Sequence, residues 1–177
     1  EQAFNNLLSS FKAKRLPHAL VISGEKGIGK KLFAKEICKM LVLALGVAIP
    51  EDTQMPFADT NSSAWYAPYV AAAHKNGIVN GRSETIFGTG DYLTREELCA
   101  LADRAAISAG IYLDDEFTIF PFEDETQIST WALNSVLKMR ESFIVSGMGG
   151  NVFNPKAPVT RAQAAKIIYG VIAYAAQ

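Results

Sequence analysis

The chain has 177 residues, which is enough for one domain or for a few small repeats around a shared core. Its composition, 49% apolar and 20% charged, is typical of a soluble globular protein. Residues 1–42 carry eight Lys and Arg against three Glu, whereas residues 43–177 carry nine against fifteen acidic residues, so the net charge of −1 hides two segments of opposite sign. Because no comparable basic surface continues through the second segment, we expect no nucleic-acid partner.

Cysteines, histidines and apolar runs exclude further classes of protein. Cys38 and Cys99 each lie in an apolar helical pattern, so we interpret them as core residues and not as a disulfide framework. The apolar run over residues 40–50 is too short to cross a bilayer, so we expect no membrane partner. His18 and His74 have no second ligand at metal spacing, which predicts no metal site. No nucleophile–histidine or paired-carboxylate arrangement is recognisable, so we expect no enzymatic activity and no cofactor.

The first elements in chain order are a basic amphipathic helix predicted over residues 3–15 and a glycine-rich loop over residues 24–31. The loop has the spacing G-x-x-x-x-G-K of a phosphate-binding loop, and its candidate phosphate-binding residues are Gly24, Gly27, Gly29 and Lys30. Lys31 occupies the position of the Ser or Thr whose hydroxyl would bind magnesium. We therefore expect at most weak phosphate binding and no magnesium-dependent hydrolysis of ATP.

Residues 15–24, together with this loop, resemble the start of the ATPase module of the bacterial clamp-loader delta-prime subunit. The resemblance ends near residue 42, because the sheet and the acidic strand that such a module needs do not follow. It leaves two alternatives open for the function. One is a nucleotide-binding fragment related to clamp loaders, and the other is a recombined or engineered chimera with no native function.

From residue 57 onwards the sequence repeats itself once, at a spacing of 65 or 66 residues. Five pairs recur in the same order: Phe57 and Phe122, Trp65 and Trp131, Gly81 and Gly147, Phe87 and Phe153, and Thr94 and Thr160. Each repeat is predicted to run from a loop through a helix near the Trp, a glycine turn and an anchoring Phe into a second helix.

The second helix of each repeat is predicted to begin at a threonine. Thr94 and Thr160 are each followed three residues later by Glu or Gln, which is the pattern of a capping box. Arg95 and Arg161 stand at the first helical position, where a cation opposes the helix dipole. A repeated arginine there favours an anionic ligand, whose carboxylate the guanidinium fork can bind, or a salt bridge to a neighbouring acid. Both interpretations stay open.

Other repeated positions are also candidate ligand contacts. A flat indole face suits the C–H face of a sugar ring, but the two tryptophans could equally be wedges in the core. The two aspartates of the F-x-D pattern have a structural alternative as turn or cap residues. The repeated glycines allow a sharp turn or the close approach of a ligand. The candidate ligand-binding set is therefore Arg95, Arg161, Trp65, Trp131, Gly81, Gly147, Asp59 and Asp124.

These residues resemble the S-layer homology module, whose pattern runs F-x-D, W, G-I/V-x-G, F-x-P and T-R-A-E. The match covers about residues 43–177 and is strongest over residues 151–163, and residues 87–89 (Phe-Gly-Thr) replace F-x-P in the first repeat. The resemblance implies an all-α protein in which three modules form a pseudo-threefold prism around a central bundle of their second helices. It also implies that grooves between the modules bind the pyruvylated secondary polysaccharide of a bacterial cell wall.

The chain offers two clear modules, residues 51–115 and 116–177. A third would come from residues 1–50, where residues 34–41 align with a second helix but the F-x-D, Trp and T-R elements are missing. We interpret this segment as a degenerate or grafted first module that is recruited as the third helix pair, since two modules alone would leave apolar helix faces uncovered. The predicted function is that of a non-catalytic, monomeric, extracellular anchor that binds cell-wall polysaccharide.

Overall fold

The structure is a computed structural model that describes residues 33–51, 55 and 57–176. Its regular elements are α2 (Ala34–Ala44), α3 (Ala67–Lys75), α4 (Arg95–Ser108), the short 3₁₀ helix η1 (Glu125–Gln127), α5 (Thr130–Glu141) and α6 (Arg161–Tyr174). Over these residues β-pairing is confined to isolated bridges, which confirms the predicted all-α class. The helix predicted at residues 3–15 and the loop at residues 24–31 lie outside the described residues.

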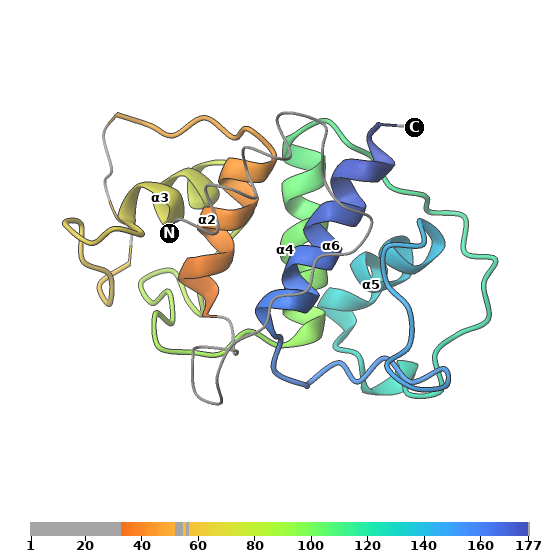
Figure 1. Cartoon of the computed structure of the whole chain (residues 1–177). Helices are drawn as coiled ribbons and strands as arrows, with labels where there is room; N and C mark the ends of the chain where they lie inside the picture. The colour runs from red at the N-terminus through yellow and green to blue at the C-terminus, as the bar shows by residue number, and fades with distance from the viewer. Residues whose placement is uncertain (1–32, 52–54, 56, 177) are drawn as a thin grey trace.

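Three helices, α2, α4 and α6, pack against one another at the centre of the molecule (Figure 1). The first helix of each repeat flanks this bundle, with α3 beside α2 and α5 beside α4 (Figure 1). Each first helix therefore packs mainly against the second helix of the preceding unit. Of the third helix pair predicted from residues 1–50, the described residues contain α2, which packs against α3, α4 and α6. Within the described ranges, no helix is long and apolar enough to span a membrane.

The core contribution of α2 comes from one face of the helix. Ile37, Cys38, Leu41 and Val42 are at most 1% exposed, at the spacing that places side chains on one side of a helix. Cys38 and Cys99 are both fully buried, and burial raises the pKa of each thiol to about 12. Both thiols therefore stay protonated at neutral pH, and their burial without a disulfide confirms their interpretation as core residues.

Both predicted capping boxes are present. The Thr94 N–H donates to Glu97 Oε2 over 2.7 Å, and the Glu97 N–H donates to Thr94 Oγ1 over 3.4 Å. The same two bonds join Thr160 and Gln163 at 2.9 and 3.3 Å. These bonds satisfy N–H groups of the first turn that have no partner inside the helix, so α4 and α6 begin where the sequence predicts.

Short backbone pairs join the three helix starts. Phe33, which precedes α2, bridges Tyr92 in the loop before α4, and Thr94 bridges Pro158 in the loop before α6. The two bridges are equivalent in the repeat. In each, the N-cap residue of one central helix pairs with the residue that lies two positions before the N-cap threonine of the next. The repeat in the sequence is thus also a repeat in space.

These contacts define two module junctions. The first junction joins the start of α2 to the loop of residues 79–93, and the second joins the start of α4 to the loop of residues 145–159. In both loops the residue after the repeated glycine donates its N–H to the carbonyl four positions later, over 2.7 and 2.8 Å. The anchoring Phe of each loop packs on the Phe of the F-x-D pattern, at ring-centroid distances of 5.4 and 5.1 Å.

The turn after each first helix requires a left-handed backbone. Gly77 has a φ of 68° after α3, and Phe143 has a φ of 55° at the equivalent position after α5. Glycine adopts this conformation freely, whereas an L-residue with a side chain is strained in it. Phe143 is 87% exposed, so packing does not explain its presence there.

Candidate ligand-binding site

The repeated aspartates hold the backbone of the junction loops. Asp59 accepts hydrogen bonds from the N–H groups of residues 87–89 over 2.7–3.1 Å. Asp124 accepts equivalent bonds from residues 153 and 154, both over 2.7 Å. Burial raises the pKa of the Asp59 carboxyl, but the three N–H donors outweigh burial and hold the pKa below its usual value. Each carboxylate thus fixes the loop that forms one wall of its junction.

Arg95 lies inside the second junction and is only 6% exposed. Its Nη2 donates to the Ser146 carbonyl over 2.8 Å, and its guanidinium carbon lies 4.9 Å from the centroid of the Phe153 ring. Burial lowers the pKa of the Arg95 guanidinium, and its Nε has no hydrogen-bond partner among the described residues. The side chain fills the space between the start of α4 and the loop of the next module.

Arg161 has a different environment from Arg95, although the two residues are equivalent in the repeat. Its side chain is 47% exposed and forms an ion pair with Glu36 of α2. The difference arises from the neighbouring module, which offers Arg95 a backbone carbonyl and a ring but offers Arg161 a carboxylate. Of the two arginines, only Arg161 presents a substantial part of its side chain to solvent.

The two tryptophans are half exposed. Trp65 is 53% and Trp131 is 54% exposed, so neither indole is buried in the core as the wedge interpretation requires. The ammonium of Lys39 on α2 lies 5.5 Å from the centroid of the Trp65 ring. Trp131, at the start of α5, reaches the first junction.

A hollow of about 390 Å³ opens at the first junction, and we call it the first groove. Its lining comes from the start of α2, the loop of residues 79–93, one side of α4 and, from the other repeat, Trp131. Its charged lining residues are Arg82, Glu97 and Arg104. A hollow of this size matches a small-ligand site with an apolar wall and a few polar groups.

The repeated glycines are required by close approach within the junction loops. Gly81 borders the first groove with a φ of 74°, and a Cβ atom there would lie 2.5 Å from the Phe57 ring. A Cβ atom on Gly147 would lie 2.4 Å from the Gly150 carbonyl oxygen. Both glycines therefore shape the loops that wall the junctions.

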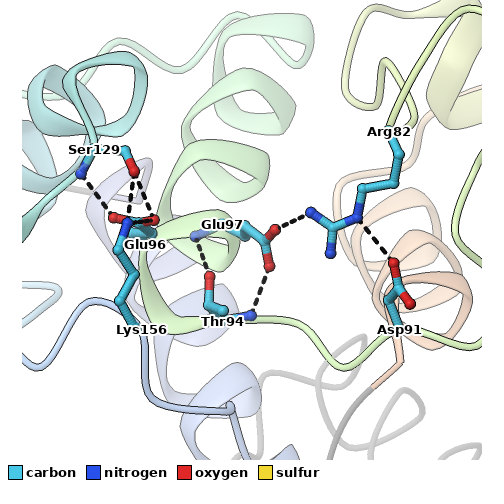
Figure 2. Close-up of polar contacts among 7 residues, drawn as sticks. All are labelled: Arg82, Asp91, Thr94, Glu96, Glu97, Ser129 and Lys156. Atoms are coloured by element: carbon cyan, nitrogen blue, oxygen red, sulfur yellow. Dashed lines mark hydrogen bonds and ion pairs between the residues drawn. The ribbon is translucent and has the colours of Figure 1, made fainter.

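On one wall of the first groove, charged side chains are linked by hydrogen bonds and ion pairs, as Figure 2 shows. Glu97 accepts the Thr94 N–H through one oxygen and pairs with Arg82 through the other, and the Arg82 Nε donates to Asp91 over 3.0 Å. The cation of Arg82 is therefore committed to two carboxylates. No group of three or more potential metal ligands occurs in the part of the chain that the structure describes.

A network of hydrogen bonds and one ion pair at the buried Glu96 carboxylate joins the two repeats, and we call it the tie at Glu96 (Figure 2). Glu96 is 3% exposed and accepts bonds from the Ser129 N–H at 2.9 Å, the Ser129 hydroxyl at 3.0 Å and the Lys156 ammonium at 2.5 Å. It connects the start of α4 to the start of α5 and to the second-junction loop. The repeat in the sequence gives no signal of these bonds, because the residue equivalent to Glu96 in α6 is Ala162.

Comparison with known proteins matches the two repeats to one family. A model of the S-layer homology domain family matches residues 56–99 and 121–165, about half of the chain. An amylopullulanase of Thermoanaerobacterium thermosulfurigenes is 40% identical over 116 residues, 66% of this chain and 6% of that protein. The exoglucanase XynX of Acetivibrio thermocellus is 38% identical over 116 residues, 66% of this chain and 11% of that protein.

A surface-layer 125 kDa protein of Lysinibacillus sphaericus is 32% identical over 108 residues, which are 59% of this chain and 9% of that protein. This chain spans only 6–18% of the curated relatives that it matches. Each of the two segments that the family model matches runs from the F-x-D turn through the aspartate-held loop to the capped start of a second helix. The chain therefore belongs to the S-layer homology domain family.

Proposed function

We propose that this protein attaches to the bacterial cell wall by binding an acidic polysaccharide in grooves between its modules. The observation that carries the proposal is the first groove, where the half-exposed indole of Trp131 and arginines of the other repeat line the same hollow. An indole face packs on the C–H groups of a sugar ring, and a guanidinium binds a carboxylate through two parallel N–H bonds. A pyruvate ketal supplies such a carboxylate, so the polymer we propose is a pyruvylated secondary polysaccharide.

Membership of the family places the chain at the cell surface or in the cell wall, as an anchoring module. An amylopullulanase, an exoglucanase and a surface-layer protein each contain a matching segment that is 6–11% of the protein. A segment shared by proteins with such different names fits attachment better than catalysis. In this proposal the chain is a non-catalytic, monomeric anchor, and the activities in the names of its relatives lie in other parts of those larger proteins. The nucleotide-binding alternative rests on residues 24–31 and gains no support from the described residues.

The two repeated arginines have separate roles in this proposal. Arg161 is exposed and can exchange Glu36 for a ligand carboxylate, so it is the ligand-binding residue of the pair. Arg95 is buried and joins the start of α4 to the second-junction loop through its bond to the Ser146 carbonyl. Trp65, beside the ammonium of Lys39, offers a second aromatic platform next to a cation.

Co-sedimentation with purified sacculi tests the proposal. We expect the chain to pellet with sacculi of surface-layer bacteria, Lysinibacillus sphaericus among them, and to stay in solution after hydrofluoric acid has stripped the secondary polymer. Arg161→Ala should weaken binding about ten- to hundredfold, because a charge-assisted contact contributes about 1.5–3 kcal/mol. Arg161→Lys should restore binding in part, since it keeps the charge without the fork. Equal binding to intact and stripped sacculi would refute the proposal.

A further inference from the structure

The first groove is open because α2 lacks the arginine that fills the second junction. The first helical residue is Arg95 in α4 and Arg161 in α6, but it is Ala34 in α2. The counterparts of Ser146 and Phe153, which Arg95 contacts, are Asn80 and Phe87.

Ala34, Asn80 and Phe87 all line the hollow. The space that a long cationic side chain occupies at the second junction is therefore accessible to a ligand at the first. A ligand in this space would have no contact with an arginine at the first helical position, because that residue of α2 is Ala34.

Arg104 is the cation of this groove that forms no ion pair with a described residue. It is partly buried on α4, and its one hydrogen bond among the described residues runs from Nη1 to the Ile78 carbonyl at 3.5 Å, the outer limit for such a bond. No carboxylate of the described residues lies within ion-pair distance of it, whereas Arg82 is paired with Asp91 and Glu97. Four of the five guanidinium donors of Arg104 are thus available.

The position of Arg104 distinguishes this groove from the second junction. The equivalent residue in α6 is Gly170, where an added Cβ atom would lie 2.8 Å from the Ile144 side chain. The equivalent in α2 is Leu43. Of the three central helices, only α4 can therefore project a cation from this position.

We propose that Arg104 and Trp131 together bind an acidic sugar residue in the first groove, with the guanidinium on the carboxylate and the indole on the ring. This inference rests on the proposed function and names the residue that recognises the anion where no helix-start arginine is present. The two side chains come from different repeats and line one hollow. Glu97 also faces it, but both of its carboxylate oxygens are occupied by the Thr94 N–H and by Arg82, so Arg104 is the group left to attract an anion.

The two tryptophans of the chain make a selective test possible. In a Trp65→Phe background all tryptophan fluorescence comes from Trp131 and reports on the first groove. The probe is wall polymer made soluble from sacculi with lysozyme, and its control is the same polymer after mild acid has removed the pyruvate ketal. We expect the ketal-bearing polymer to change the Trp131 emission and the control polymer to bind at least tenfold more weakly.

Three substitutions in that background complete the experiment. Arg104→Gln should weaken the titration tenfold or more, and Arg104→Lys should recover part of the loss because it keeps the charge but not the fork. Lys75→Gln removes an exposed charge at the end of α3, outside the groove, and should change nothing. Melting curves show whether each variant folds. If Arg104→Gln does not fold, Arg104→Lys alone tests the inference, and a loss of polymer affinity of threefold or more supports it.

The outcomes separate this inference from the proposed function. A parent chain that binds no sacculi overturns both. If the parent binds sacculi and Arg161→Ala weakens that binding, but Arg104→Gln and Arg104→Lys titrate Trp131 as the parent does, only the role of Arg104 is overturned. An emission change that is the same with and without the ketal also overturns it, because the carboxylate would then not be the group recognised.

Discussion

Replacement of Asp124 by alanine should release the second-junction loop from the F-x-D turn. Asp124 is 8% exposed and accepts the N–H groups of Phe153, which is fully buried, and of Asn154, both over 2.7 Å. Alanine leaves both donors without an acceptor. A hydrogen bond to a charged group contributes about 1.5–3 kcal/mol, and because the two bonds share one carboxylate we take the lower value for each. The expected loss is about 3 kcal/mol, a large part of the stability of a typical domain.

Thermal and urea denaturation, followed by circular dichroism at neutral pH, measure this loss. For a chain of this length about 3 kcal/mol corresponds to a fall in Tm of about 6–12 °C. Asp124→Asn should lose about half as much, because the amide keeps one acceptor oxygen. Glu123→Ala is the matched control, since Glu123 is exposed on the same turn and should leave Tm nearly unchanged.

The result that contradicts this reasoning is an Asp124→Ala variant with the Tm and urea midpoint of the parent. If the same variant also fails to pellet with sacculi, the carboxylate is a ligand contact and not a structural one. That outcome would favour the other interpretation that the sequence leaves open for the F-x-D aspartates.

Three further predictions concern backbone strain, coupling and pH. Phe143→Gly should raise the urea midpoint by an amount equivalent to about 1 kcal/mol, because the left-handed backbone no longer carries a side chain; an unchanged or lower midpoint contradicts this. A double-mutant cycle of Glu96→Gln and Lys156→Met should give a coupling energy of about 1 kcal/mol, since Lys156 is largely exposed, whereas purely additive losses would show that the contact is not formed. The pKa of the Asp59 carboxyl is lower in the folded than in the unfolded chain. Its contribution to the free energy of unfolding is therefore fully present above the unfolded pKa of about 4 and is lost as pH falls through the folded pKa. The stability difference between the parent and Asp59→Asn should therefore shrink below about pH 4, and parallel pH curves would contradict the assignment.

Local features of the fold could be predicted from the sequence because they depend on neighbours in the chain. The capping boxes at Thr94 and Thr160 join residues three positions apart, so their bonds follow from the sequence pattern alone. The apolar spacing of α2 predicted its place in the core in the same way, although that segment lacks the family motif. The duplication itself predicted that the loops, turns and second helices would repeat in space.

Contacts between modules could not be predicted in this way, and they decide the candidate site. Arg95 and Arg161 have the same place in the repeat, yet one is buried against Ser146 and the other is exposed beside Glu36. The tie at Glu96 was missed for a related reason, because it joins segments 33 and 60 residues apart and has no counterpart in the other repeat.

The duplicated sequence by itself determined the helical class and the starts of α4 and α6, since these rest on local hydrogen bonds and on the period of the apolar residues, and its repeated motifs carried the resemblance to the family. Only the tertiary structure decided which junction is filled and which is open. The open groove depends on Ala34 of one segment, the loop of residues 79–93 and Trp131 of the other repeat lining the same hollow. The physical reason is that the exposure and the partners of a side chain depend on the residues of the neighbouring module. The sequence of one repeat contains no information about which residues of another module will lie beside it.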